Sequence, residues 1–231
     1  MNSVSNPFRK DGASRQTGIV YLVIDPSVER AELLEKTRQA LDGGADILQI
    51  WNRWPKDMDR RGKERLVASI KELALDHGAP LLINEEWDLL KTANLDGVHF
   101  DAIPEDFERI RGEVACDFIA GITCSNDLEI VRWAEENGMD YVSFCAMFPS
   151  LSVGDCEIVR PETVREAREL TSLPLLLSGG ITPGRIDGPL RQLEPQFDGV
   201  AVISGILDAA APGEAASAYK RALSRKAVDA T

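Results

Sequence analysis

The chain has few residues of the kinds that build disulfide frameworks, metal centres or membrane spans. Its 231 residues include four cysteines and two histidines. No two cysteines form a C-x-x-C pair, so we expect buried thiols and no histidine-rich metal site. No apolar run approaches the ~18 residues that span a bilayer. Residues 1–16 lack the apolar centre of a signal peptide, and we expect a flexible tail there, a cytoplasmic protein and no membrane partner.

Basic residues are the scarcer class of charge. Lys and Arg number 26 against 38 Asp and Glu, which leaves a formal charge of −12 at pH 7. A nucleic-acid surface needs clustered Lys and Arg, so nucleic acid is not an expected partner. A small anion stays compatible with this balance, because backbone amides and helix N-termini bind phosphate even in an acidic protein.

Strand and helix patterns alternate along the chain. Continuous apolar runs, of which GIVYLVI at 18–24 is the clearest, are typical of strands buried on both faces. The expected strands cover 18–24, 47–51, 80–84, 97–100, 118–123, 141–145, 175–178 and 199–202. The expected helices cover 28–41, 56–77, 87–93, 104–110, 126–137, a stretch beginning at 161, 183–193 and 212–225.

This alternation predicts an α/β fold with one domain, a TIM (β/α)8 barrel over 17–226, with short tails at 1–16 and 227–231. An open doubly wound sheet is the alternative, but no G-x-G-x-x-G follows the first strand. A second regularity supports the barrel: Asp46, Asp96, Asp140 and Asp198 each precede an even-numbered strand. The competing interpretation is that an Asp before apolar residues is common in helix-to-strand loops.

In such a barrel the functional residues lie at the C-terminal ends of the strands. Residues 175–183 and 198–206 each run from a strand through small residues into a helix. Two such turns can direct backbone N–H groups at one anion. We therefore predict a phosphate site at Gly179, Gly180, Ile203 and Ser204, and the alternative is two tight turns without a ligand.

Seven short motifs occur in the order and spacing of the thiamine phosphate synthase family. They are YLVID at 21–25, LQI at 48–50, IN at 83–84, DGVH at 96–99, FPSLS at 148–152, GGI at 179–181 and VIS at 202–204. The chain resembles this family, which includes a related thiazole tautomerase, over roughly residues 18–207. Family members join a hydroxymethylpyrimidine diphosphate to a thiazole phosphate and release pyrophosphate with the help of Mg²⁺. The resemblance implies a small phosphorylated heterocyclic ligand.

The resemblance also implies roles for individual residues. Gln49 matches the glutamine that contacts the pyrimidine, Asn84 matches the asparagine beside the pyrophosphate, and Thr123 stands at a small hydroxyl position. Arg53 stands where the family has a lysine. Binding of the thiazole phosphate is implied for Ser150, Ser152, Gly179, Gly180, Ile203 and Ser204. Glu85 and Asp101 are the candidate ligands for Mg²⁺. His99 is interpreted as a structural histidine at a strand end.

The chain departs from the family pattern on the pyrophosphate side. Trp51 replaces an arginine, Glu86 replaces another arginine, Val153 replaces a lysine, and Pro104 falls where the family has a second metal carboxylate. Each lost cation raises the barrier to releasing a charged pyrophosphate. Two hypotheses follow: a divergent synthase, or a barrel that binds a thiazole phosphate or thiamine phosphate without joining the precursors.

A third hypothesis is a different reaction on a phosphorylated substrate. The tautomerase activity of the family loses its acid/base residue in this chain. Its histidine after the fifth strand is replaced here by Cys124 or Ser125. Trp51 and Trp54 are unusual at a charged barrel mouth. They stack on an aromatic ligand, or they cover an oligomer contact such as that of a homodimer.

Overall fold

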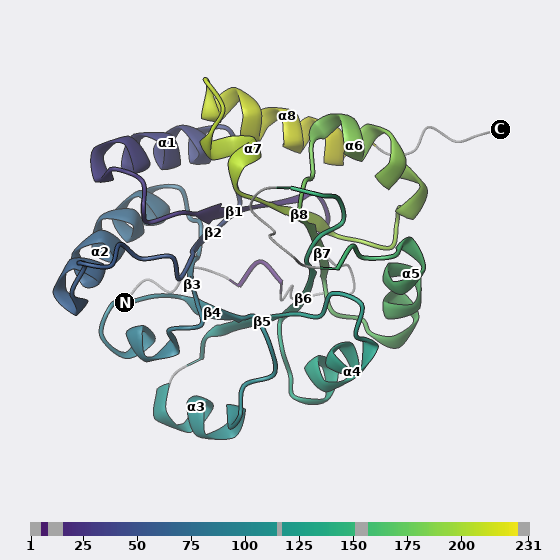
Figure 1. The fold of residues 1–231 in the computed structure, drawn as a ribbon, viewed down its shortest axis with the longest axis horizontal. Coiled ribbons are helices and arrows are strands. Elements are labelled where there is room, and N and C mark those ends of the chain that lie inside the picture. The colour runs from purple at the N-terminus through teal and green to yellow at the C-terminus, as the bar shows by residue number, and fades with distance from the viewer. Residues whose placement is uncertain (1–5, 9–15, 115–116, 151–156, 226–231) are drawn as a thin grey trace.

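The computed structural model describes residues 6–8, 16–114, 117–150 and 157–225. Within them, eight parallel strands close into a barrel in chain order, and β8 pairs with β1 (Figure 1). The strands are β1 Ile19–Ile24, β2 Ile47–Ile50, β3 Leu81–Asn84, β4 Gly97–Phe100, β5 Ile119–Thr123, β6 Tyr141–Phe144, β7 Leu175–Ser178 and β8 Gly199–Val202. The predicted TIM barrel is confirmed.

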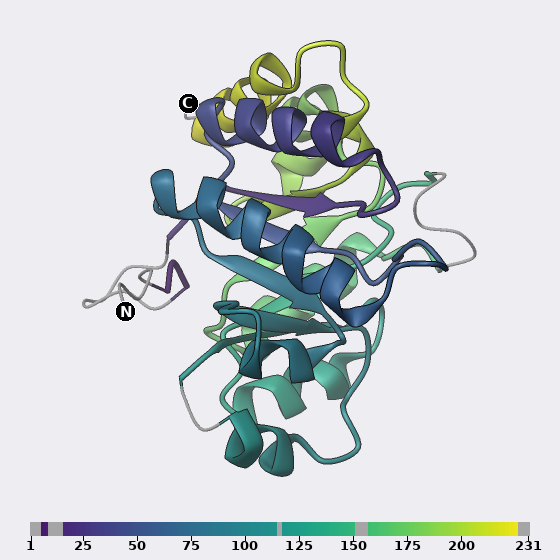
Figure 2. The same cartoon turned by 90° about the vertical axis from the view of Figure 1, so that its left-hand side faces the viewer.

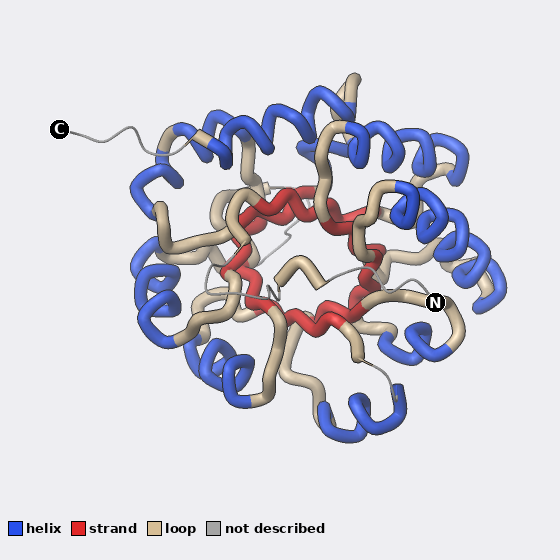
Figure 3. Tube along the Cα trace, turned by 180° about the vertical axis from the view of Figure 1, so that it is seen from behind, coloured by secondary structure: helices blue, strands red, loops and turns tan. Residues whose placement is uncertain are grey.

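The helices form a ring outside the strands (Figures 1 and 3). They are α1 Arg30–Asp42, α2 Arg60–Asp76, the 3-10 helix η1 Trp87–Lys91, α3 Phe107–Val114, α4 Leu128–Glu136, α5 Pro161–Leu170, α6 Pro183–Asp187, the 3-10 helix η2 Pro189–Leu193, α7 Ser204–Leu207 and α8 Pro212–Ser224. In the part of the chain described, none of them is long and apolar enough to cross a membrane.

Three helices differ most from the sequence prediction, and the other expected helices agree to within two residues at each expected end. The helix expected at 183–193 is two short helices, because Pro189 disfavours a helical conformation at Gly188 before it. The helix expected from residue 56 begins at Arg60, where the Asp59 carboxylate caps it by accepting from the Gly62 N–H at 2.7 Å. The helix expected at 104–110 begins only at Phe107.

The barrel interior is filled by side chains that alternate along the strands. Alternate residues of β1 point inward, and they pack with inward-facing residues of β2, β3, β5, β6 and β7. This inner cluster consists of Phe8, Ile19, Tyr21, Val23, Ile47, Leu82, Ile119, Tyr141 and Leu176. The opposite faces of the strands pack against the helices in a larger apolar cluster. The strands are therefore buried on both faces, as their continuous apolar runs predict.

Residues 6–8 lie at the end of the barrel where the strands begin (Figure 2). The Phe8 ring stacks on Tyr141 with centroids 4.4 Å apart and is 8% exposed. Asn6 donates from Nδ2 to Asp140 Oδ1 at 2.8 Å. Asn6 and Phe8 thus form part of the barrel floor, although they fall in the stretch expected to be a tail. Residues 1–5, 9–15 and 227–231, where we also expected tails, lie outside the described residues.

The aspartates before the even strands form one repeated contact. The Oδ2 atoms of Asp46, Asp96, Asp140 and Asp198 accept the N–H groups of Val20, Leu81, Ala120 and Leu175 at 2.7, 2.7, 2.8 and 2.9 Å. The N–H group of each aspartate donates back to the carbonyl of the same partner. Each even strand is thereby locked in register to the odd strand before it. The predicted even-strand repeat has this structural basis.

Candidate functional site

A cavity of about 150 Å³ opens at the C-terminal ends of the strands, and we call it the mouth cavity. Nine of the predicted site residues line it: Gln49, Asn84, Asp101, Thr123, Ser150, Gly179, Gly180, Ile203 and Ser204. Arg53 and Glu85 are not among its lining residues, and Ser152 lies outside the described residues. The strand ends therefore bring together residues that lie up to 155 positions apart in the chain, from Gln49 to Ser204.

Glycine and hydroxyl groups form one side of the mouth cavity. Gly179 and Gly180 have φ angles of 83° and 64°, which favour glycine. The N–H groups of Gly180, Ser204 and Gly205 have no hydrogen-bond acceptor among the residues described. Ser150 Oγ is buried there and likewise has no partner within the described chain. This side offers donors for an anion and needs no lysine.

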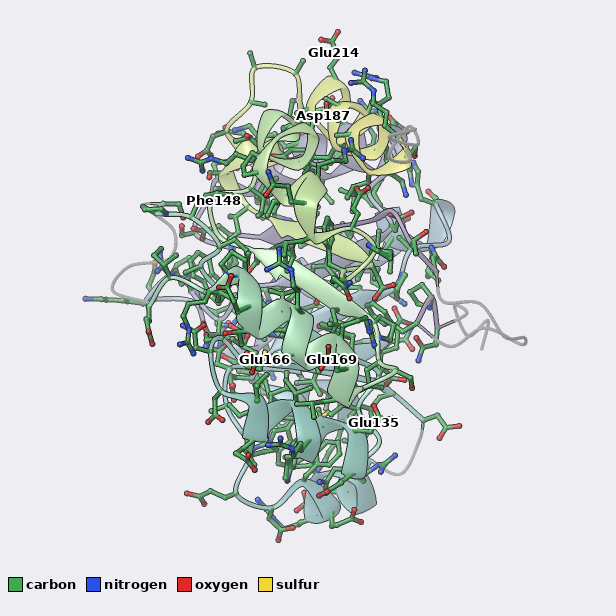
Figure 4. The ribbon with its side chains drawn as sticks, turned by 90° about the vertical axis from the view of Figure 1, so that its right-hand side faces the viewer. Glu135, Phe148, Glu166, Glu169, Asp187 and Glu214 are labelled. Carbon is green, nitrogen blue, oxygen red and sulfur yellow. The ribbon has the colours of Figure 1, made fainter. Side chains whose placement is uncertain are left out.

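Arg185 is a cation beside this side that the sequence reasoning missed. Its guanidinium lies 4.5 Å from the centroid of the Phe148 ring, and Nη1 donates to the carbonyl of Gly180. The Phe148 N–H donates to the Gly179 carbonyl at 3.0 Å, which ties the loop after β6 to the turn after β7. Figure 4 shows Phe148 at one end of the barrel. No motif indicated Arg185, because its position depends on this contact between loops.

Asn84 and Asp101 line a second side of the mouth cavity, and Glu85 contacts Asp101 from outside the lining. Asn84 Nδ2 donates to Asp101 Oδ1 at 3.0 Å, and the Asp101 N–H donates to Glu85 Oε1. Asn84 Oδ1 is buried and has no hydrogen-bond partner in the described part of the chain. Burial raises the pKa of Glu85, and the neighbouring Asp101 charge raises it further against the hydrogen bond from the Asp101 N–H. Two carboxylates and the Asn84 amide are thus linked by hydrogen bonds.

The two tryptophans differ in position. Trp51 lines the mouth cavity, and the Arg53 guanidinium lies 3.7 Å from the centroid of its ring. Trp54 is not among the lining residues, and Lys63 Nζ lies 5.0 Å over its ring. Lys63 also pairs with Glu86 at 2.6 Å. Of the two aromatic side chains, Trp51 is therefore the one placed to contact a ligand.

The floor of the mouth cavity is polar, and sequence reasoning missed most of it. Tyr21 and Tyr141 line the cavity from below, and both hydroxyls are hydrogen-bonded there. Their strand alternation places them inside the barrel, which is the signal that could have identified them. His99 joins them, and burial lowers its pKa to about 4, so the imidazole is neutral at pH 7. His99 thus lines the site rather than only ending a strand.

Cysteine chemistry contributes little at this site. Cys124 is a buried thiol, and its burial raises its pKa well above the usual range, so it is a poor acid or base at neutral pH. Cys145 lines the mouth cavity. Among the described residues, no group of three or more His, Cys, Asp or Glu side chains is arranged to hold a metal ion.

Comparison with known proteins places this barrel in one family. Residues 20–206 match the sequence profile of the thiamine monophosphate synthase family. A thiamine-phosphate synthase of Clostridium perfringens is 33% identical over 191 residues, which cover 82% of this chain and 88% of that protein. One of Nitrosococcus oceani is 32% identical over 203 residues, covering 87% and 91%.

A solved structure supports the fold independently. The thiamine phosphate pyrophosphorylase from Pyrococcus furiosus superposes with a TM-score of 0.73 over 89% of this chain and 95% of that one, at 24% sequence identity. At that identity the likeness concerns the fold alone, whereas the sequence matches carry the family. The chain belongs to the thiamine monophosphate synthase family.

Proposed function

We propose that the protein joins hydroxymethylpyrimidine diphosphate to thiazole phosphate and releases pyrophosphate, as a synthase of thiamine biosynthesis. The observation that carries the proposal is the family match over residues 20–206, whose motifs converge on one cavity. In the reaction, the bond from the pyrimidine methylene to the pyrophosphate oxygen breaks, and a bond from that carbon to the thiazole nitrogen forms. No proton has to move, so catalysis depends on positioning and on stabilising charge.

The thiazole phosphate fits the side of the mouth cavity built from Ser150, Gly180 and Ser204. The unpaired N–H groups and the orphaned Ser150 hydroxyl there match the several acceptor oxygens of a phosphate. Gly179 and Ile203 shape the same turns, and we assign Ser152 to this group by the resemblance alone. Bound in this way, the phosphate orients the thiazole nitrogen toward the pyrimidine.

The pyrimidine diphosphate fits the opposite side. We assign the pyrimidine ring to Gln49 and Thr123, with Trp51 as an aromatic wall beside it. We assign Asn84 to the leaving pyrophosphate, as the resemblance implies. Arg53 is the nearest replacement for the cations that the family pattern places here, and it would have to leave the Trp51 ring to reach the pyrophosphate.

The residues present fit a Mg²⁺ ion held by Glu85, Asp101 and Asn84 Oδ1. Magnesium uses one or two carboxylates, with water and substrate phosphate completing its shell, so a larger cluster is not required. The buried, unpaired Asn84 Oδ1 beside two carboxylates is the observation that supports this assignment. When bound, Mg²⁺ would neutralise charge on the departing pyrophosphate. Glu85 and Asp101 would hold and orient the ion, and Trp51 would exclude water from the ring.

The proposal is tested by measuring pyrophosphate release from the two precursors with Mg²⁺. Ser150→Ala removes one donor, and we expect the KM for thiazole phosphate to rise about tenfold with the KM for the pyrimidine diphosphate unchanged. Ser224→Ala, an exposed serine at the end of α8, is the matched control and should change neither. No turnover by the folded wild-type protein would refute the synthase and leave the ligand-binding barrel as its replacement.

We also propose that the enzyme acts in the cytoplasm and forms a homodimer. Both are expectations for a biosynthetic enzyme of this family, and sedimentation velocity of the purified chain tests the second. A monomer at micromolar concentration would contradict the dimer.

A further inference from the structure

A continuous chain of hydrogen bonds crosses the barrel interior beneath the mouth cavity. Tyr21 Oη donates to Gln49 Oε1 at 2.7 Å and lies 2.9 Å from Tyr141 Oη. Tyr141 Oη lies 2.9 Å from His99 Nδ1, and His99 Nε2 lies 2.9 Å from Thr123 Oγ1. Side chains from five different strands therefore form four contacts in one line, and Gln49 and Thr123 stand at its two ends.

The donor of each hydrogen bond in this line can be assigned, because each contact holds one proton. Tyr21 gives its only proton to Gln49 Oε1, so the proton between the two tyrosines must come from Tyr141. Tyr141 then accepts from His99 Nδ1–H. A neutral His99 with its proton on Nδ1 has a bare Nε2, which accepts from Thr123 Oγ1–H. The direction of the hydrogen bond between Tyr21 and Gln49 thereby determines the direction of the one between His99 and Thr123.

The side chains of this hydrogen-bonded line are shielded from water, which could otherwise supply alternative partners. Tyr21 and Tyr141 are each 1% exposed, and His99 is 7% exposed. Phe8 of the barrel floor covers Tyr141 from below, with ring centroids 4.4 Å apart. A buried hydroxyl or imidazole without a partner costs about 1–3 kcal/mol, so these groups hold their contacts to one another.

We propose that Tyr21, Tyr141 and the Nδ1–H tautomer of His99 act as positioning residues that set the hydrogen-bonding pattern of the mouth cavity. With Oε1 engaged by Tyr21, Gln49 has its amide NH2 left to donate to a ligand. With its proton engaged by His99, Thr123 has its oxygen lone pairs left to accept. The site then selects a nitrogen heterocycle that presents a ring acceptor to Gln49 and an amino donor to Thr123, and it rejects the oxo analogue with the reversed pattern.

The identity of the ligand rests on the proposed function, whereas the proton order does not. The reversed order would turn the Gln49 amide, move the His99 proton to Nε2 and make Thr123 a donor. The His99 tautomer therefore reports the orientation of Gln49 as well. The chain holds only two histidines, His77 and His99, so ¹⁵N-histidine labelling yields two imidazole signals that a His77→Gln variant assigns.

The first experiment is ¹⁵N–¹H NMR of the labelled protein at pH 7.5, without ligands. We expect a single His99 tautomer with a protonated Nδ1 and a bare Nε2. Tyr141→Phe keeps the ring stacking but removes the acceptor of Nδ1–H, and we expect it to give a mixture of tautomers. Tyr219→Phe, which removes a buried hydroxyl bonded to the Ile181 carbonyl at 2.8 Å, is the matched control and should leave His99 unchanged. A His99 protonated at Nε2 overturns the proposal.

The second experiment measures ligand selection by titration calorimetry, with the amino-substituted pyrimidine diphosphate and its oxo analogue. The wild-type protein should bind the amino form at least tenfold more tightly. Tyr141→Phe frees Thr123 to donate, so the ratio should fall by about tenfold, which is the worth of one good hydrogen bond. Tyr219→Phe should preserve the ratio. Equal weakening of both ligands by Tyr141→Phe would indicate a merely structural role and overturn the selection. If neither binds the wild-type protein, the proposed function fails, and the NMR result decides the proton order by itself.

Discussion

Asp198 and Leu175 exchange two hydrogen bonds at the start of β7 and β8. The Asp198 carboxylate accepts the Leu175 N–H at 2.9 Å, and the Asp198 N–H donates to the Leu175 carbonyl at 2.8 Å. Arg168 of α5 also contacts this carboxylate at 3.2 Å. A strand, its neighbour and a covering helix thus meet at one buried acid, and three further aspartates repeat the contact between strands around the barrel.

Asp198→Ala should therefore destabilise the fold. It leaves the Leu175 N–H without its acceptor and the Arg168 guanidinium without its counter-charge, which costs about 3–5 kcal/mol in the free energy of unfolding for a buried pair. Asp187→Ala is the control: this aspartate pairs with Arg191 and Arg225 at the surface (Figure 4), and its loss should cost at most about 1 kcal/mol. Urea denaturation measures both. Similar losses of stability in the two variants would contradict this role of Asp198.

Gly180→Ala should abolish binding at the phosphate side. A Cβ there would lie 2.9 Å from Arg185 Nη1 and 3.0 Å from Phe148 Cβ, so both neighbours of the turn must move. Gly78→Ala has the same backbone penalty, with φ +66° against +64°, but no heavy atom lies within 4 Å of its Cβ. Calorimetric titration with thiazole phosphate should give at least a tenfold loss for Gly180→Ala and no change for Gly78→Ala. Unchanged affinity in Gly180→Ala would remove this turn from the site.

Phe8→Ala should loosen the barrel floor. The ring is buried in the inner cluster, and the loss of a buried phenylalanine ring typically costs about 3 kcal/mol or more. Removing it also opens Tyr141 to water from below, so the single His99 tautomer should become a mixture in the ¹⁵N spectrum. Leu75→Ala, at a side chain that is 42% exposed on α2, should change neither quantity. Wild-type stability in Phe8→Ala would show that residues 6–8 do not contribute to the floor.

The stability of the protein without Mg²⁺ should depend on pH through Glu85. Burial raises the folded-state pKa of this acid above its ordinary value of 4.5, so the folded state favours the protonated form. As pH rises from about 4.5 through the folded pKa, the unfolded chain ionises more readily, and the folded protein loses stability that it does not regain at higher pH. Glu85→Gln should lack this loss.

The comparison is made by urea unfolding of wild type and Glu85→Gln at pH 4 and pH 7.5. We expect the variant to gain relative stability at the higher pH, and Mg²⁺ to stabilise only the wild type. Glu86→Gln is the control. Glu86 is paired with Lys63, so this variant should be less stable than the wild type at pH 7.5. A wild type that gains stability over Glu85→Gln as pH rises would contradict the raised pKa.

The strands were the most predictable part of the fold. Their apolar runs are continuous because both faces are buried. The end of α2 was also predictable, because Gly78 after it adopts a φ of +66°, which favours glycine. Helix ends were less predictable. The split at Gly188 follows from Pro189, a signal that helical spacing alone passes over, and the late start of α3 was not marked by any residue pattern.

The site residues likewise fall into those that the sequence predicted and those that it did not. Gln49, Asn84 and Gly180 could be found because each lies at or just beyond the C-terminal end of a strand, and these ends of a barrel must converge. Arg185 could not be found, because its place depends on the Phe148 loop. Strand alternation could have placed Tyr21 and Tyr141 inside the barrel, but their hydrogen bonds to each other and to His99 could not be found, because the three residues lie on different strands and meet only when the barrel closes.

The sequence by itself determined the barrel, its strand order and the family, because these depend on periodicity and on motifs that stay local to the chain. Only the tertiary structure decided how the polar groups at the mouth face one another. It placed Arg53 on Trp51, left Asn84 Oδ1 and Ser150 Oγ without partners in the described chain, and brought Thr123 Oγ1 to 2.9 Å from His99 Nε2. The physical reason is that a hydrogen bond extends about 3 Å and has a direction. Its partner is therefore set by barrel closure rather than by separation along the chain.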